Sequence, residues 1–153
     1  MDVKYVNPFV ESFSAVMPQL GFANVQKGKL SLKGRELTSS GVIIIVGIVG
    51  AVRGNVVYTI DIENAKKIAS TMMMGMPVNE FDEMSKSAIS ELTNMLTANA
   101  ATCFSNIGIS IDISTPTLLQ GEEVSVKMSS DQVLCIQLLA ESIPIEINIA
   151  FES

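Results

Sequence analysis

The chain has 153 residues, of which 48% are hydrophobic and 17% charged, and its net charge is −6. This composition is typical of one core-rich globular domain, spanning residues 1–153, and argues against a disordered chain or a partner nucleic acid attracted by a basic surface. Because the sequence has no histidine, it excludes serine–histidine and cysteine–histidine catalytic centres.

The sequence carries no sign of secretion, membrane insertion or metal binding. The first residues lack the charged and apolar segments of a signal peptide. The longest apolar run, Val42–Val52, is too short to cross a bilayer. The carboxylates do not cluster into a metal site, and Cys103 and Cys135 lie in apolar runs, where buried free thiols are expected. We therefore expect a cytoplasmic protein without a metal of its own.

The first half of the chain predicts one helix followed by three strands. Apolar residues recur at three- and four-residue spacing near the start, as in a helix with one buried face. A later β-branched run predicts a central strand covered on both faces, or by helices on one face and a partner on the other. In order, we expect a helix over 4–20, a strand over 23–33, a polar loop over 34–41, the central strand over 42–52 and a hairpin strand over 56–62.

The second half predicts two helices followed by four strands. In order, we expect a helix over 63–75, a long helix over 80–107 that starts at Asp82 or Ser85, and strands over 109–119, 124–128, 133–140 and 143–151, with a turn at Gly121–Glu123. The fold class is therefore α+β: a mainly antiparallel sheet of about six to seven strands with three helices packed on it.

The long helix is predicted to bury one stripe of side chains and to expose another. The exposed stripe has one carboxylate and one amide among small residues, which would let another backbone approach closely. The expected buried stripe is Ala88, Ile89, Leu92, Met95, Leu96, Asn99, Ala100, Cys103 and Ile107, with Asn99 as a hydrogen-bonded amide. The expected exposed stripe is Ser87, Glu91, Asn94, Ala98, Ala101 and Ser105.

Spacing alone does not make this stripe a functional site. Glu-x-x-Asn is a common tetrapeptide, so a solvated helix face is the more ordinary interpretation of Glu91 and Asn94. The preceding segment Met72–Pro77 is likewise interpreted as core and helix stop rather than as a methionine-lined recognition surface.

The two halves of the sequence suggest an internal repeat with pseudo-two-fold symmetry. Each half has a helix, a strand, a loop and a hairpin, and one polar spacing occurs in both helices. The triplet Asn7, Glu11 and Ser14 of the first helix matches Ser87, Glu91 and Asn94 of the long helix, although chance similarity is the alternative. If the repeat is real, the short Ser14 hydroxyl would not reach the partner that the amide of Asn94 reaches.

A fourth residue makes the pattern more specific. Pro116 follows Asn94 by 22 positions. Together, Ser87, Glu91, Asn94 and Pro116 resemble the signature of the CheC/CheX/FliY family of bacterial chemotaxis phosphatases, in which Asp or Ser, Glu, Asn and a later Pro occur at these spacings. The resemblance is nearest to the short CheX type and covers essentially the whole chain. It implies one active site per chain, because the first copy carries Ser14 in place of the amide.

The resemblance also implies a function. Members of the family dephosphorylate the aspartyl phosphate of a CheY-like receiver domain. Asn94 would position the attacking water, Glu91 would anchor the receiver, and three small residues of the long helix with the later proline would flank the docked surface. These flanking residues are Ser87, Ala98, Ala101 and Pro116.

Cofactors and partners follow from the same resemblance. No cofactor of the chain's own is implied, and Mg²⁺ would come with the receiver. It further implies a CheD-type regulator as a candidate partner and a homodimer joined through sheet edges. The strand over 42–52 and the last strand are compatible with that role.

Two other functions stay open at this point. A non-catalytic module of the same fold could dock on a receiver or a flagellar switch and leave the lifetime of the phosphoryl group unchanged. A small-molecule-binding α+β domain would need a deep polar pocket, and the sequence has no phosphate loop or nucleotide motif.

Overall fold

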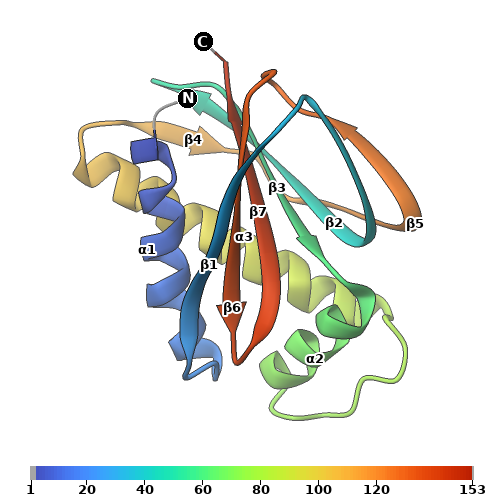
Figure 1. Cartoon of the computed structure of the whole chain (residues 1–153). Helices are drawn as coiled ribbons and strands as arrows, with labels where there is room; N and C mark the ends of the chain where they lie inside the picture. The colour runs from blue at the N-terminus through green and yellow to red at the C-terminus, as the bar shows by residue number, and fades with distance from the viewer. Residues whose placement is uncertain (1–2, 153) are drawn as a thin grey trace.

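Helices cover one face of a curved antiparallel sheet (Figure 1). The computed structural model describes residues 3–152; Met1 and Asp2, on which the expectation about a signal peptide partly rests, lie outside this range. The helices are α1 (Asn7–Val16), α2 (Ile62–Met72) and α3 (Glu83–Asn106), and short 3₁₀ turns η1 (Val3–Tyr5) and η2 (Met17–Leu20) flank α1. The strands are β1 (Val25–Lys33), β2 (Glu36–Gly50), β3 (Gly54–Ile60), β4 (Ile111–Ile113), β5 (Thr117–Lys127), β6 (Val133–Ala140) and β7 (Ile143–Phe151).

The seven strands form one sheet in the order β1-β6-β7-β3-β2-β4, and β5 also pairs with β2. All pairs are antiparallel, so the predicted α+β class, strand number and three helices are confirmed. The strand over 42–52 and the last strand, which we expected to be compatible with edge contacts, lie inside the sheet, because β2 and β7 each have neighbours on both sides.

The pairing scheme is symmetric. Exchanging β1, β2 and β3 for β5, β6 and β7 leaves every pair among these six strands unchanged. The β1–β6 pair becomes β5–β2, the β2–β3 hairpin becomes β6–β7, and the β3–β7 pair maps onto itself. A duplicated unit would produce this scheme, and the duplication itself stays a prediction.

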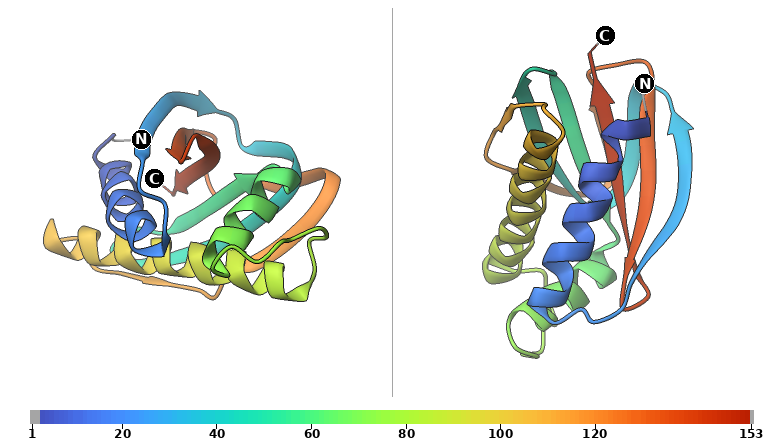
Figure 2. Two further views of the ribbon diagram at one scale, coloured as in Figure 1. Left: turned by 90° about the horizontal axis from the view of Figure 1, so that it is seen from below. Right: turned by 90° about the vertical axis from the view of Figure 1, so that its left-hand side faces the viewer.

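The sheet is packed on both faces by this chain alone. Alternate residues of β2, such as Val42 and Ile44, point into the large core beneath the helices. Between them, Ile43 points to the other face, where β2 and β5 curl over a smaller apolar cluster (Figure 2). That cluster consists of Leu37, Ile43, Val57, Val126, Met128, Val133 and Ala150. The expectation of a central strand covered on both faces is therefore confirmed.

Two predicted irregular segments are strand. The expected loop over 34–41 is reduced to two residues, because β2 begins at Glu36, and the expected turn at Gly121–Glu123 lies within β5. Residues 36–39 of β2 pair with residues 124–127 of β5, and Gly41 pairs with Gly121. The hydroxyls of Thr38 and Ser125 lie 3.2 Å apart across this two-stranded ribbon. The polar residues of these stretches face solvent in the ribbon, a pattern that sequence alone does not separate from a loop.

The ends of the first two helices follow their local signals, whereas the segment after α2 is more exposed than predicted. Pro18 falls in the 3₁₀ turn that ends the first predicted helix, and Gly21 closes it with φ of 100°. Past α2, Gly75 likewise has a positive φ of 86°, as expected of a helix stop. Met72 and Met73 pack against the core as predicted, but the rest of the segment does not, because Met74 is 97% exposed and Met76 is 56% exposed. Among residues 3–152, no helix has the length and hydropathy required to cross a bilayer.

The buried stripe of α3 differs from the predicted one near its end. Phe104 is fully buried, whereas Ile107 is 54% exposed and lies just past the helix. Thr93 and Thr97 are also buried, and a carbonyl of the preceding turn satisfies each hydroxyl. Thr93 donates to Ile89 at 3.0 Å, and Thr97 donates to Thr93 at 2.7 Å. The buried face is therefore rotated toward the threonines.

The Tyr58 hydroxyl links β3 to α3 across the core. It lies 2.7 Å from Oγ1 of Thr97, whose own proton goes to the carbonyl of Thr93, so Tyr58 is the donor. We expect Tyr58→Phe to lower the free energy of unfolding by about 1 kcal/mol, the usual net value of one such hydrogen bond. Urea denaturation at neutral pH measures this change.

The same tyrosine gives the stability a pH dependence. Burial raises the pKa of Tyr58 well above its ordinary value, and the smaller effect of the Thr97 hydrogen bond opposes this. The folded chain therefore holds a proton that the unfolded chain loses above about pH 10, so stability falls as pH rises past that point. The deficit of Tyr58→Phe relative to the wild type should shrink above pH 10, and a deficit that stays constant to pH 11 would contradict this prediction.

Candidate functional site

The candidate site is on α3, which begins at a strong capping residue. The Asp82 carboxylate accepts hydrogen bonds from the backbone N–H of Ser85 at 2.9 Å and from its hydroxyl at 2.8 Å. These bonds, led by the backbone one, lower the pKa of Asp82. The helix then packs against α1 and α2 and contacts β4, β5 and β2. One face of α3 is thereby fixed against the rest of the molecule.

The opposite face of α3 carries the predicted stripe. Glu91 is exposed and Asn94 is half-buried. Within residues 3–152, neither side chain has a hydrogen-bond or ion-pair partner, so both are free to bind another molecule. Of the remaining stripe residues, Ser87, Ala98 and Ser105 are exposed and Ala101 is half-buried.

Pro116 lies on the flank of this helix rather than on the stripe. It is half-buried in the connection between β4 and β5. Because α3 contacts both of these strands, the connection runs back beside the helix (Figure 2). The predicted site residues therefore come from one helix and the segment alongside it.

The matching triplet of α1 is also at the surface. Asn7, Glu11 and Ser14 are all exposed. Glu11 lies close to Cys103 of α3: burial raises the pKa of this thiol, and the negative charge of Glu11 adds to the shift. The thiol also lies 3.8 Å from Oδ1 of Asn99, which is half-buried rather than buried. The triplet of α1 thus borders the α1–α3 contact, and its Ser14 offers no amide.

The cysteine and metal expectations can be compared with the structure. Cys103 and Cys135 are free thiols; Cys135 is buried as expected, while Cys103 is only half-buried. Within the described part of the chain, no three acidic, histidine or cysteine side chains are grouped so that they could hold a metal ion.

One exposed residue of this face was missed by the sequence interpretation. Met84 is 61% exposed and lies seven residues before Glu91, so the stripe continues toward the start of α3. The same heptad spacing in the sequence could have indicated it. With Met84 included, the face offers a thioether, a carboxylate and an amide, each able to bind but none able to act as a strong base. Such a surface can orient a water molecule and pair with a cation.

The chain is similar to chemotaxis phosphatases of the CheX type. The family model described as "Chemotaxis phosphatase CheX" matches residues 42–139. A protein of Thermotoga maritima named CheY-P phosphatase CheX is 32% identical over 128 residues, which cover 83% of this chain and 82% of that protein.

Solved structures agree with this fold. A CheC-like superfamily protein from Shewanella sp. PV-4 superposes with a TM-score of 0.87 and 28% identity, covering 100% of both chains. A chain from the CheX–CheY–BeF₃–Mg²⁺ complex of Borrelia burgdorferi gives a TM-score of 0.81 and 29% identity, covering 99% of this chain and 100% of that one.

Proposed function

The chain belongs to the CheX family of chemotaxis phosphatases, and from this premise we propose that it hydrolyses the aspartyl phosphate of a CheY-like receiver domain in the cytoplasm. The observation that carries the proposal is the Glu91–Asn94 pair on the outward face of α3, which has no partner among residues 3–152, in a chain 32% identical to a CheY-P phosphatase. The whole chain acts as one CheX-like domain.

Asn94 is the residue that acts on the reacting atoms. Its Oδ1 accepts a hydrogen bond from a water molecule and holds the water oxygen in line with the phosphorus. The water oxygen bonds to phosphorus as the bond from phosphorus to the aspartyl oxygen breaks. The products are the aspartate carboxylate and inorganic phosphate, which keeps both protons of the water as H₂PO₄⁻ and can then lose one to solvent. An amide suits this position because it brings no negative charge near the phosphoryl group.

Glu91 anchors the receiver. Its carboxylate lies one helical turn before Asn94 and pairs with a basic side chain beside the phosphoryl group of the receiver. Ser87, Ala98 and Ala101 are small enough to let the receiver backbone approach α3, and Pro116 shapes the flank of the contact. The exposed carboxylate and the small neighbours support this arrangement.

The receiver brings the remaining chemistry. The Borrelia complex contains Mg²⁺ and BeF₃ together with CheY, and beryllofluoride is a chemical mimic of a phosphoryl group. We assign the metal to the receiver in our protein as well, since the described residues provide no carboxylate cluster for it. A CheD-type regulator is a candidate second partner on grounds of family membership alone.

The direct test is phosphate release from a phosphorylated, Mg²⁺-loaded CheY receiver, measured with and without the chain. The proposal expects faster release with the chain present. Receiver binding without any change in phosphoryl lifetime would instead support the non-catalytic docking module and overturn the phosphatase assignment.

We also propose a homodimer joined through a sheet edge. β1 pairs with β6 alone among the described strands, and it exposes Leu32 by 71%. Light scattering should give a mass near twice 16.4 kDa, and Leu32→Lys should shift it toward the single mass. A wild-type monomer at micromolar concentration would contradict the dimer.

A further inference from the structure

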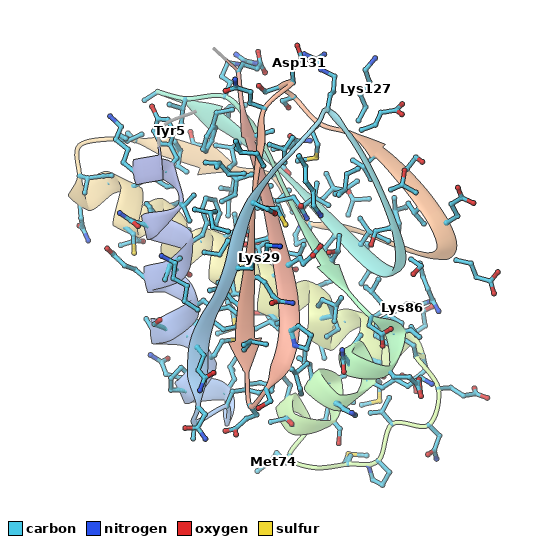
Figure 3. The ribbon with its side chains drawn as sticks, viewed as in Figure 1. Tyr5, Lys29, Met74, Lys86, Lys127 and Asp131 are labelled. Carbon is cyan, nitrogen blue, oxygen red and sulfur yellow. The ribbon has the colours of Figure 1, made fainter. Side chains whose placement is uncertain are left out.

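A methionine patch extends the exposed stripe of α3 toward the start of the helix. Met84 lies close to two helical turns before Glu91, so both side chains project from the same face. Met76, in the connection before the helix, is also exposed, and the two thioethers line one pocket of about 430 Å³. Figure 3 shows this end of the molecule, with Met74 at the tip of the connection and Lys86 on the first turns of α3. A contiguous exposed apolar surface of this kind favours contact with another molecule.

The pocket combines apolar walls with a negatively charged rim. Met73 and Val78 are half-buried lining residues, and the carboxylates of Glu80 and Asp82 are at the rim. Its lining residues, which all fall between positions 73 and 85, include no basic side chain. The pocket is therefore complementary to an apolar group that has a cation next to it.

Hydrogen bonds hold the pocket in shape without a ligand. The Ser70 hydroxyl donates to the carbonyl of Met76 at 2.7 Å, and the N–H of Gly75 donates to the carbonyl of Ser70 at 2.8 Å. On the other side, Asp82 caps α3 through Ser85. Binding there would require little ordering of the chain, which lowers the entropic cost of association.

Met84 is near enough to Asn94 to belong to the same interface. A rise of 1.5 Å per residue places their Cα atoms about 15 Å apart along the helix. A standard interface buries about 800 Å² on each partner, which corresponds to a disc of roughly 16 Å radius. A receiver centred on Asn94 would therefore reach Met84 along a continuous helix face.

We propose that Met84 and the adjoining pocket form a second docking point for the receiver, which takes one apolar side chain flanked by a lysine or arginine. This inference rests on the proposed function, because it places the same receiver on the same face of α3. The pocket buries the apolar side chain, while Glu80 and Asp82 pair with the basic neighbour. Contact at both Asn94 and Met84 fixes the rotation of the receiver on the helix, and receivers that lack the apolar–basic feature bind weakly.

The test compares Met84→Ala with Ile107→Ala, using a phosphorylated, Mg²⁺-loaded CheY receiver that the wild-type chain dephosphorylates. Ile107 is a matched control because it is similarly exposed but lies at the opposite end of α3 and off the stripe. Met84→Ala should raise KM about tenfold, as expected for losing a buried thioether, and change kcat by less than about twofold. Ile107→Ala should change neither constant. Glu80→Lys, on the exposed connection, should also raise KM about tenfold through charge reversal.

The outcomes separate the two proposals. If the wild type is active and both Met84→Ala and Glu80→Lys leave KM unchanged, the second docking point is wrong and the phosphatase activity stands. A fall in kcat at constant KM also overturns it, since docking acts on affinity. If the wild type does not accelerate phosphate release from any CheY receiver, the proposed function fails and the docking point fails with it. Circular dichroism melting checks that the variants are folded. If Met84→Ala does not fold, the result for Glu80→Lys decides the question.

Discussion

Asn94→Ala should reduce the acceleration of phosphate release by about 100-fold or more while receiver binding largely survives. The methyl group cannot hold the attacking water, and loss of a positioning contact of this kind commonly costs about two orders of magnitude in rate. The side chain has no hydrogen-bond partner within residues 3–152, so its removal leaves no unpaired group in the fold. The measurement is phosphate release in a single turnover, with the phosphatase at a concentration that saturates the phosphorylated receiver.

The control for this substitution is Asn106→Ala. Asn106 is an exposed amide on the same helix, three turns further on and outside the proposed contact. It should keep wild-type activity and the same affinity for a beryllofluoride-loaded receiver. Full activity of Asn94→Ala would show that another group positions the water.

Glu91→Lys should weaken binding of the receiver by about 100-fold, and Glu91→Gln by about tenfold. The first substitution turns an attraction into a repulsion beside the receiver's basic side chain, and the second only removes the attraction. The difference between them should shrink as salt is added, because exposed charges are screened. Titration of a beryllofluoride-loaded receiver at several ionic strengths measures both effects.

Glu11→Lys is the matched control for charge reversal. Glu11 has the corresponding place in the α1 triplet and is exposed. Its substitution by lysine changes the net charge by the same amount as Glu91→Lys. Its substitution should leave receiver affinity within about twofold of the wild type, since salt screens the long-range effect of net charge on binding. Equal weakening by both variants would mean that overall charge, not a contact at Glu91, governs binding.

The sequence predicted best the elements with local signals. Asp82 was an expected cap for the long helix, and it accepts hydrogen bonds from Ser85. The last hairpin has the expected bounds because its apolar residues alternate without interruption from Ile143. The exposure of Glu91 followed from helical periodicity alone, since a face crowded with small and polar residues opposes the core.

The failures concern contacts between distant segments. Phe104 is buried because rings from three other parts of the chain surround it: Tyr5, Phe9 and Phe151 lie 5.8–6.2 Å from it between centroids. Helical spacing could not reveal those neighbours. The start of β2 was missed for a similar reason, because its polar residues are ordered by pairing with β5, which is about 85 residues away in the chain.

The role of Asn94 is of a different kind. Its place on the outward stripe of α3 could be predicted, and the side chain is half-buried there. Its proposed chemistry, however, depends on a partner's phosphoryl group. Helix geometry could not distinguish it from an ordinary solvated amide. Only the combination with Ser87, Glu91 and Pro116 suggested a function, and that function stays a prediction at the level of individual residues.

The symmetric pairing of the strands has a consequence for how this protein can change over time. The strand β1 completes the sheet beside β6, and α1 braces the helix that bears Glu91, with the hydroxyl of Ser12 donating to the carbonyl of Leu96 at 2.5 Å. Strands of the two halves alternate in one sheet, so the half that carries Ser14 cannot be removed without disrupting the half that carries Asn94. Substitutions on the exposed side of α1 are therefore compatible with an intact fold, whereas its buried side has to keep supporting α3.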